Sequence, residues 1–463
     1  MVIDPASRRD RDTPATPVGA RCIGDDLTVL CVDGVERVSV NLDAGASTPA
    51  LDVVGAAVFD LLPWYSSVHR GAGAKSQFST DRYEAARDAV LRFSGGRPDD
   101  MAVLCRNTTE AINIAAHRLG LKPGDTVVTT VAEHHANLLP WQRLHRDRGI
   151  GIRWVECDRR GMFDPDDVIA ALEAGPPPAL LAITGAANVT GWMPDVEPAV
   201  DAAHRLGARV LLDAAQLAPH RPLHTAADLI AWSGHKMYAP FGTGALVGPA
   251  DLFAEGDPLI VGGGAVRLVD LDDVVWADAP DREEAGSPNV VGAVALAAAI
   301  EWYEATGWES IVAHERAQSK RLRRGLGSIT GVHLLGPDPA DVDADDSMLA
   351  VGAFNVAGLD HPLLAARLSA EYGIAVRHGC FCAHPYLVRL LGLDAATTAR
   401  YRADIVAGDR RNIPGAVRAS ATITTTDEQI DSFLAAVADL AAGKPAPVSY
   451  HQDPATGDYS PVT

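Results

Sequence analysis

The apolar run Leu229-Ile230-Ala231-Trp232 leads directly into Ser233-Gly234-His235-Lys236, and the turn-rich stretch Ala239-Pro240-Phe241-Gly242-Thr243-Gly244 follows. This pattern predicts a short buried strand that ends in a tight turn, with one lysine at its carboxyl end. Burial penalises the ammonium form and so lowers the pKa of a lysine, which makes the neutral amine available as a nucleophile. For Lys236 considered alone, an ordinary surface lysine in a loop is the alternative.

A second apolar run supplies a partner for this lysine. The segment Arg209-Val210-Leu211-Leu212-Asp213-Ala214-Ala215-Gln216 predicts another buried strand, with Asp213 at its end. Ligands of α/β sheets gather at the carboxyl ends of the strands, so we expect Asp213 and Lys236 to face one site. A lysine that forms a Schiff base and a carboxylate that keeps a pyridine nitrogen protonated are the two groups that pyridoxal 5'-phosphate (PLP) requires.

With this pair the chain resembles the fold-type I PLP enzymes of aminotransferase class V, and most of all the group II cysteine desulfurases and selenocysteine lyases. The resemblance extends from about Val40 to about Ala441. It implies an α/β fold with a mostly parallel seven-stranded sheet in a large domain, followed by a smaller C-terminal α+β domain. It also implies a homodimer.

Composition narrows the class of protein independently. The 463 residues include 60 acidic and 40 basic side chains, a formal net charge of −20, which argues against sequence-independent binding of nucleic acid. We find no apolar stretch long enough to span a bilayer and no signal-peptide core at the N-terminus, so we expect no membrane partner and a cytoplasmic location. Six cysteines in so long a chain do not indicate a disulfide framework, and Cys22, Cys31, Cys105 and Cys157 are expected to be inert thiols.

Strands and helices alternate through the middle of the chain, as in a parallel sheet covered on both faces. Buried strands are predicted near residues 125–130, 152–155, 179–183 and 210–212, and further strands near 348–356, 374–378 and 416–421. We predict a mobile N-terminal arm over residues 1–36 with room for a short hairpin, a large PLP-binding domain over 37–300, a small C-terminal domain over 301–442 and a disordered tail over 443–463. The last helix is expected to begin at Thr426, because Thr-Asp-Glu-Gln429 forms a capping box.

Two threonines open an apolar-periodic run at Asn107-Thr108-Thr109-Glu110-Ala111. A helix N-terminus offers free N–H groups and favours an anion, although a plain helix cap explains Thr108 and Thr109 equally well. The family resemblance implies that they hold the PLP phosphate, with Asn107 where the family has glycine.

The same resemblance implies roles for further residues around the cofactor. His134 would stack on the pyridine ring with His135 in support, and Asn188 and Gln216 would lie near the phenolic oxygen. The remaining implied positions are Ser233 and His235 at the phosphate, His69 near the mouth of the site, and Ser287, which would reach the phosphate bound by the partner subunit.

The segment Arg377-His378-Gly379-Cys380-Phe381-Cys382-Ala383-His384-Pro385 bears on the reaction itself. The resemblance implies that Cys382 is the cysteine that accepts sulfur. A thiolate is the nucleophile in such chemistry, and Arg377, His378 and His384 are neighbours able to lower the pKa of the thiol or accept its proton.

Other interpretations of this segment remain open. His378, Cys380, Cys382 and His384 alternate as zinc ligands on one strand face would, whereas Gly379 and Pro385 favour a loop. The two cysteines could also be inert. Gly-Cys-Phe-Cys resembles the cysteine loop of molybdenum-cofactor sulfurases, which raises the hypothesis that Cys380 relays sulfur from Cys382 by persulfide exchange.

The resemblance further implies that Arg418 binds the substrate carboxylate through its planar guanidinium, with Arg377 also on the substrate side. An arginine exposed on an edge strand is the alternative. The spacer over residues 386–417 is longer than is usual in the family, and we expect it to form a lid or a partner surface.

Together these features predict a PLP-dependent cysteine desulfurase. It would convert L-cysteine to L-alanine, hold the sulfur as a persulfide on Cys382 and pass it to a protein acceptor. Alternatives are another class V activity (selenocysteine lyase, C–S lyase, transaminase or epimerase) or a non-catalytic sulfur-relay partner.

Overall fold

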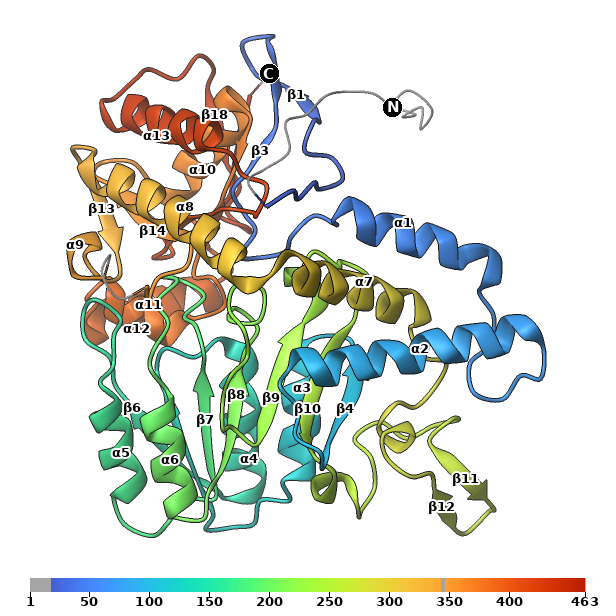
Figure 1. Cartoon of the computed structure of the whole chain (residues 1–463). Helices are drawn as coiled ribbons and strands as arrows, with labels where there is room; N and C mark the ends of the chain where they lie inside the picture. The colour runs from blue at the N-terminus through green and yellow to red at the C-terminus, as the bar shows by residue number, and fades with distance from the viewer. Residues whose placement is uncertain (1–17, 343–345, 463) are drawn as a thin grey trace.

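A seven-stranded sheet forms the centre of the larger domain in this computed structural model, which describes residues 18–342 and 346–462. Only β10 runs against its neighbours; the other adjacent pairs are parallel (Figure 1). Across the sheet the order is β4 (Asp100–Cys105), β10 (Gly244–Pro249), β9 (Leu229–Ser233), β8 (Arg209–Asp213), β7 (Leu180–Thr184), β5 (Thr126–Thr130) and β6 (Gly151–Val155). The strands predicted at four of these positions are confirmed.

Helices cover both faces of this sheet, and successive strand residues serve the two faces alternately. Leu180 and Leu211 pack with α3 (Thr108–Arg118) and α4 (Leu139–Arg148), whereas Leu181 and Leu212 belong to the core on the opposite side. The second face is covered by α5 (Pro165–Glu173), α6 (Glu197–Arg205), α2 (Ala74–Phe93) and α7 (Val290–Thr306), with α1 (Asp52–Leu61) beyond them (Figure 1). Burial on both faces explains why these strands read as continuous apolar runs.

The smaller domain is built on a four-stranded antiparallel sheet in the order β13 (Val332–Leu335), β14 (Val351–Val356), β17 (Ala416–Ser420) and β16 (Arg377–Gly379). Its core is closed by α8 (Trp308–Ser328), α10 (His361–Tyr372) and α13 (Asp427–Ala441). Thr426 caps α13, and the predicted capping box with Gln429 is present. The helical run breaks at Gly307, between α7 and α8 and close to the boundary predicted after residue 300.

Residues 18–36 and 443–462, near the two ends of the chain, are more ordered than we predicted. Within the proposed arm, β1 (Thr28–Leu30) and β2 (Glu36–Val38) form the short hairpin, and the backbone N–H of Val32 donates to Ala370, so residues 18–36 are not a free arm. Residues 1–17 lie outside the described residues. After this hairpin, β3 (Val40–Asn41) pairs with β15 (Ile374–Ala375), which attaches the segment to the small domain.

The prediction of a disordered tail is wrong for residues 443–462. Strands β18 (Tyr450–Gln452) and β19 (Tyr459–Pro461) form a hairpin, and the hydroxyl of Tyr450 donates to Glu371 on α10. The hairpin also contacts the spacer before β17, because Arg410 donates its backbone N–H to the carbonyl of Pro454. The proline content of the tail suggests disorder and gives no sign of these hydrogen bonds to Glu371 and Pro454.

The long spacer folds into α11 (His384–Leu390) and α12 (Ala395–Val406), which lie between the small domain and the sheet (Figure 1). Arg389 on α11 pairs with Glu156 after β6, whereas no residue of α12 is buried. Its role as a lid or partner surface stays a prediction.

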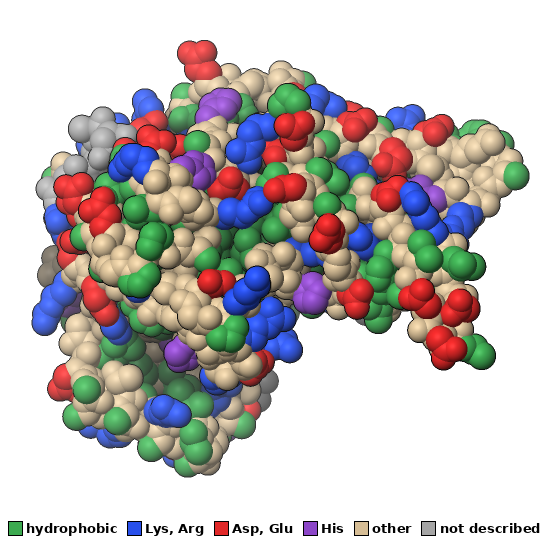
Figure 2. Space-filling view, turned by 90° about the horizontal axis from the view of Figure 1, so that it is seen from below, with side chains coloured by type: hydrophobic (Ala, Val, Ile, Leu, Met, Phe, Trp, Pro, Cys, Tyr) green, Lys and Arg blue, Asp and Glu red, His purple; other side chains and the backbone are tan. Residues whose placement is uncertain are grey.

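Charges of both signs are interspersed on the face shown in Figure 2. The projection at the right, identified by Figure 1 as the far ends of α1 and α2 with the hairpin of β11 (Val266–Val269) and β12 (Val274–Trp276), carries apolar side chains. Phe59 and Leu271 are exposed there. Within residues 18–342 and 346–462, no helix has the length and apolarity needed to cross a bilayer.

Candidate active site

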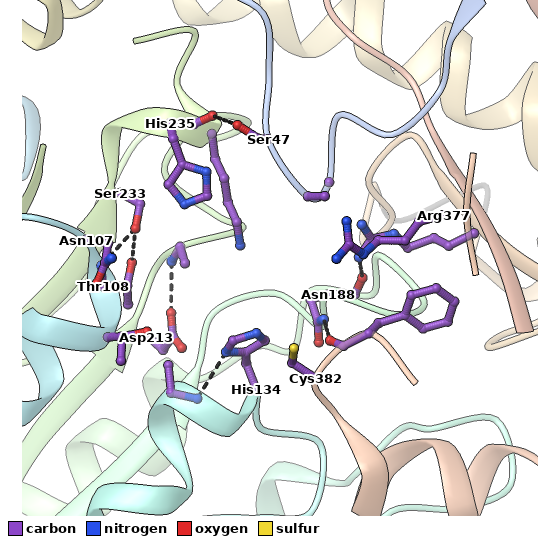
Figure 3. Close-up of a pocket in the computed structure, with 18 residues that line it drawn as sticks. Ser47, Asn107, Thr108, His134, Asn188, Asp213, Ser233, His235, Arg377 and Cys382 are labelled. Atoms are coloured by element: carbon purple, nitrogen blue, oxygen red, sulfur yellow. Dashed lines mark hydrogen bonds between the residues drawn. The ribbon is translucent and has the colours of Figure 1, made fainter. Parts of the chain in front are cut away.

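The loops that follow the carboxyl ends of five strands converge on one cavity of about 340 Å³ beneath the small domain (Figure 3). The five strands are β4, β5, β7, β8 and β9, and the residues they bring are Thr108, His134, Asn188, Asp213 and Lys236. Because parallel strands end at the same edge of the sheet, residues far apart in sequence meet here.

Lys236 lies in a single helical turn directly after β9. Gly234 is required in this turn, because a Cβ atom there would lie 2.8 Å from the carbonyl oxygen of Thr243. Removal from water lowers the pKa of Lys236 to about 8; the nearby Asp213 carboxylate opposes this shift and Arg418 reinforces it. The amine is therefore much closer to its neutral, nucleophilic form than an ordinary lysine.

Asp213 ends β8 and is almost fully buried. Burial raises its pKa, while the backbone N–H of Ala215, 3.0 Å from Oδ1, and the charge of Lys236 lower it. A protonated nitrogen placed opposite this buried carboxylate would stabilise its charged form.

The N-terminus of α3 forms one end of the cavity. Asn107 caps the helix by accepting the N–H of Glu110, and Thr108 donates its N–H to the hydroxyl of Ser233 at 2.8 Å. His235 lines the same cavity, and burial lowers its pKa to about 4. Hydroxyls and a helix N-terminus suit an anionic group, and Glu110 in the first turn of α3 pairs with Arg106 and is not part of the lining.

His134 lies between Asp213 and Cys382 in the lining of the cavity (Figure 3). Its Nδ1 accepts the backbone N–H of Ala136 at 3.0 Å, so the neutral ring carries its proton on Nε2. Burial lowers the pKa of His134 to about 3, and the charge of Lys236 adds to the effect. The ring is thus an uncharged plane at neutral pH.

Cys382 approaches the cavity from the small domain on an unusual turn. Phe381 and Cys382 both have left-handed backbone angles, with φ of 53° and 55°. Two contacts with the large domain hold this turn: Asn188 donates to the carbonyl of Phe381 at 2.7 Å, and the N–H of His135 donates to that of Cys382 at 2.8 Å. Strain of this kind persists only where surrounding contacts enforce it. The exposed thiol is therefore held at a fixed place.

Two arginines of the small domain face the same space from adjacent positions on β16 and β17. Arg418 is buried and donates to the carbonyl of Asn188 at 2.7 Å, and both Arg418 and the exposed Arg377 lie 3.5 Å from a carboxylate oxygen of Asp43. Burial lowers the pKa of Arg418 to about 10, so the guanidinium is still charged at neutral pH. A buried cation beside a cavity is a site for a carboxylate.

The lining matches a phosphorylated aromatic aldehyde in its chemistry. The hydroxyls and the helix N-terminus suit a phosphate, and the Asp213 carboxylate suits a protonated ring nitrogen. The flat His134 ring suits the face of an aromatic ring, and the Lys236 amine suits an aldehyde. In addition, Asn188 Oδ1 and Arg418 Nε are buried without a hydrogen-bond partner within the described structure. PLP and an amino-acid substrate would supply hydrogen-bond partners for both of these atoms.

Residues 40–433 match the family model for aminotransferase class-V. The chain belongs to the aminotransferase class-V family. It is 36% identical over 375 residues to a probable cysteine desulfurase of Synechocystis, covering 80% of this chain and 83% of that protein. A probable cysteine desulfurase of Halobacterium salinarum is 33% identical over 434 residues, covering 92% of this chain and 97% of that protein.

Solved structures in this family agree with the fold described above. The apo structure of a cysteine desulfurase from Thermococcus onnurineus superposes with a TM-score of 0.77 at 32% identity, over 88% of this chain and 95% of the other. The cysteine desulfurase CsdA from Escherichia coli gives a TM-score of 0.73 at 32% identity, over 87% and 94%. The predicted fold class is confirmed.

Most of the predicted site residues line this cavity. They are Thr108, Thr109, His134, Asn188, Asp213, Ser233, His235, Lys236, Arg377, Cys382 and Arg418. Gln216 is buried nearby, but its amide donates to the carbonyl of Gly45 at 2.8 Å and the side chain is not part of the lining.

Two predicted residues lie elsewhere. His69 and Ser287 line a separate cavity of about 600 Å³, where the His69 ring is 2.7 Å from Glu84. Neither reaches the cavity of its own chain that holds Lys236. The predicted role of Ser287 at the phosphate of a second subunit stays a prediction.

The sequence interpretation missed the loop of residues 43–48. Gly45, Ala46 and Ser47 line the cavity, and Thr48 donates its N–H to the carbonyl of His235 at 2.9 Å. Gly45 allows the close approach of Arg418, since a Cβ atom would lie 3.1 Å from the guanidinium carbon. The only signal in the sequence is Gly45 itself, in a small-residue segment, Ala44-Gly45-Ala46-Ser47.

The two histidines considered as zinc ligands have other neighbours. His384 stacks on His135 with ring centroids 5.1 Å apart, and His378 pairs with Asp458 of the C-terminal hairpin at 3.2 Å. Among residues 18–342 and 346–462, no group of three or more His, Cys, Asp or Glu side chains is arranged to hold a metal ion.

Proposed function

We propose that this chain is a PLP-dependent cysteine desulfurase that converts L-cysteine to L-alanine and holds the sulfur as a persulfide on Cys382. The observation that carries the proposal is an exposed thiol, fixed on a strained turn, in the same cavity as Lys236 and Arg418. Relatives named cysteine desulfurase, at 33–36% identity, support it.

PLP, when bound, supplies an electron sink that stabilises negative charge on the substrate Cα. The chain then has three tasks: to hold a proton-accepting amine at Cα, to orient the substrate, and to bring a thiolate to its sulfur. Lys236, with its lowered pKa, is the base that takes the Cα proton and later returns a proton to carbon. Asp213 balances the charge of a protonated ring nitrogen.

Orientation of L-cysteine falls to Arg418, whose planar fork binds the carboxylate from the small-domain side. Arg377 adds a second positive charge to that end, and Asp43 holds both guanidinium groups in place. With the carboxylate fixed there, the substrate sulfur is directed toward the cysteine turn.

The sulfur step follows from the thiol's position. The Cys382 thiolate attacks the substrate sulfur, the S–Cβ bond breaks with its electron pair moving to the carbon side, and a proton delivered to Cβ completes alanine. The new S–S bond leaves Cys382 as a persulfide. The asymmetry of the cysteine pair supports this choice, because Cys382 is exposed whereas Cys380 is half-buried and burial raises its pKa.

A relay through Cys380, by persulfide exchange after the first transfer, is the alternative to direct transfer of sulfur from Cys382 to the acceptor. Mass spectrometry of Cys380→Ala after treatment with L-cysteine tests it. Slower release of persulfide sulfur to an added thiol is expected, and unchanged release would refute the relay.

We also propose a cytoplasmic C₂ homodimer in which Ser287 completes the phosphate end of the partner's site. Two observations support it. Ser287 lies away from the cavity of its own chain, and apolar side chains are exposed on α1, in the turn after it and within residues 260–271: Phe59, Leu62, Trp64, Ile260, Val261, Leu268 and Leu271.

The decisive experiment is incubation of the purified holoenzyme with L-cysteine and a reductant, with alanine and sulfide measured together. Equal amounts of both products, lost in Cys382→Ser, are expected. If Cys382→Ser still turns over, the chain has another class V activity such as C–S or selenocysteine lysis, transamination or epimerisation. Protein without the yellow absorbance of a PLP–lysine adduct, even after added PLP, would indicate a non-catalytic relay partner.

A further inference from the structure

A second cavity of about 410 Å³ lies directly outside the first. Thr109, His134, Ala136 and Cys382 line both cavities, so the thiol stands at their junction. The remaining wall comes from α3, α4 and the turn between β5 and α4: Asn113, His135, Leu139, Pro140, Gln142, Arg143 and Arg146. We call this outer cavity the α3–α4 groove.

The groove differs in charge from the molecule as a whole. The chain has a formal net charge of −20, yet neither an aspartate nor a glutamate is among the residues that line the groove, and Arg143 and Arg146 are both exposed at its rim. Its floor is apolar, with Leu139 54% exposed. An acidic ligand with some apolar surface complements this combination.

The cysteine turn makes this groove the outward face of the sulfur site. The carbonyl of Cys382 is held by His135, and His384 donates its backbone N–H to His135 Nε2 at 3.2 Å. A turn fixed in this way does not swing the thiol toward a distant acceptor. The acceptor must therefore approach Cys382, and the groove is the space beside it.

We propose that the α3–α4 groove docks an acidic segment of a partner protein that presents a thiol to Cys382. This inference rests on the proposed function, because it requires a persulfide on Cys382. The acceptor thiolate attacks the outer sulfur of the persulfide, the Cys382 S–S bond breaks, and Cys382 leaves as a thiolate. The acceptor then carries the persulfide, with no net oxidation or reduction.

The test uses holoenzyme loaded with L-cysteine, freed of excess substrate and checked for the Cys382 persulfide by mass spectrometry. Two synthetic peptides are then compared as acceptors, each with one cysteine, flanked in one by Asp, Glu and Leu and in the other by Lys and Leu. We expect the acidic peptide to take sulfur about tenfold faster at low salt, with the advantage shrinking as salt screens the charges.

Variants locate the effect. Arg143→Glu with Arg146→Glu is expected to abolish the preference for the acidic peptide and leave the rate of alanine formation from L-cysteine unchanged. Arg148→Glu is the matched control, since Arg148 is an exposed arginine of the same helix that does not line the groove. It is expected to keep the preference.

Several outcomes would overturn the inference. A loaded enzyme that gives sulfur equally to both peptides, or an Arg148→Glu effect as large as that of the double variant, excludes acidic docking here but leaves the proposed function intact. A raised KM for L-cysteine in the double variant would make the groove a substrate entrance, and a changed oligomeric state would make it a contact between copies of the chain. Failure to form any persulfide on Cys382 would remove both proposals.

Discussion

The large-domain end and the small-domain end of the cavity differ in the burial of their side chains and in the strain of their backbone. At the large-domain end, Asp213, Ser233 and Thr108 are almost fully buried, and regular strands and a helix N-terminus hold them in relaxed backbone conformations. At the small-domain end, Cys382 is exposed on a left-handed turn that contacts with the other domain maintain. Buried groups tune charge and proton affinity, whereas a group that must meet a second reactant needs exposure and is fixed by strain instead.

The largest expected effect removes the amine of the buried end. Lys236→Ala should lower alanine formation from L-cysteine by about a thousandfold or more, because the proton-transfer group is lost. Product analysis with saturating PLP measures this. Lys122→Ala, a change far from the cavity, is the control, and a Lys236→Ala enzyme within tenfold of the unaltered one would contradict the assignment.

A smaller effect is expected where the two ends meet the substrate. Arg418→Lys keeps the charge but loses the planar fork, so kcat/KM for L-cysteine should fall by roughly 10- to 100-fold, mostly through KM. Steady-state kinetics measures this. Arg377→Lys, at the exposed neighbour on β16, should change KM much less, and equal effects would mean that Arg418 has no special role.

The buried end also predicts a pH dependence. Since the pKa of Lys236 is lowered to about 8, half of the amine is neutral at that pH and most of it is neutral about one pH unit higher. Recombination of PLP with enzyme stripped of cofactor, followed by its yellow absorbance, should accelerate with a midpoint near pH 8 and change little above about pH 9. Asp213→Asn should move this midpoint to lower pH, because the carboxylate opposes the shift. Acceleration that continues well past pH 9 would show an ordinary lysine.

The smallest effect concerns strain at the exposed end. At Cys382, glycine adopts the left-handed backbone without penalty and alanine does not, so Cys382→Gly should be more stable than Cys382→Ala by about 1 kcal/mol. Chemical denaturation of the two variants measures the difference. At Cys157, where φ is not left-handed, the order of stability should be reversed, with Cys157→Ala more stable than Cys157→Gly. Equal stabilities at position 382 would mean that the turn carries no strain.

Local sequence patterns could predict the buried end, whereas Cys382, Arg377 and Arg418 at the other end were predicted from the family resemblance alone. Apolar runs that end at Asp213 and Ser233 define strands on their own, and their polar ends must share an edge of the sheet. Asp43, Gly45 and the two arginines that Asp43 pairs with are joined only by the packing of the N-terminal segment on the small domain. No local pattern encodes such a contact between residues so distant in sequence.

The C-terminal tail is a second region whose structure depends on contacts with residues distant in the sequence. Pro445, Pro447 and Pro454 suggest disorder, and only the positions of Glu371 and Arg410 in the folded chain provide the partners that order the hairpin. His69 and Ser287 differ again, because their expected roles depend on a second subunit rather than on the fold of one chain.

The pairing of His378 with Asp458 has a practical outcome. Asp458 belongs to the terminal hairpin, and His378 lies on the strand that runs into the sulfur-bearing turn. A purification tag fused after the last residue, or a deletion of that hairpin, would therefore disturb the strand that leads into the turn of Cys382. Expression plasmids for this enzyme should carry their tags at the amino end.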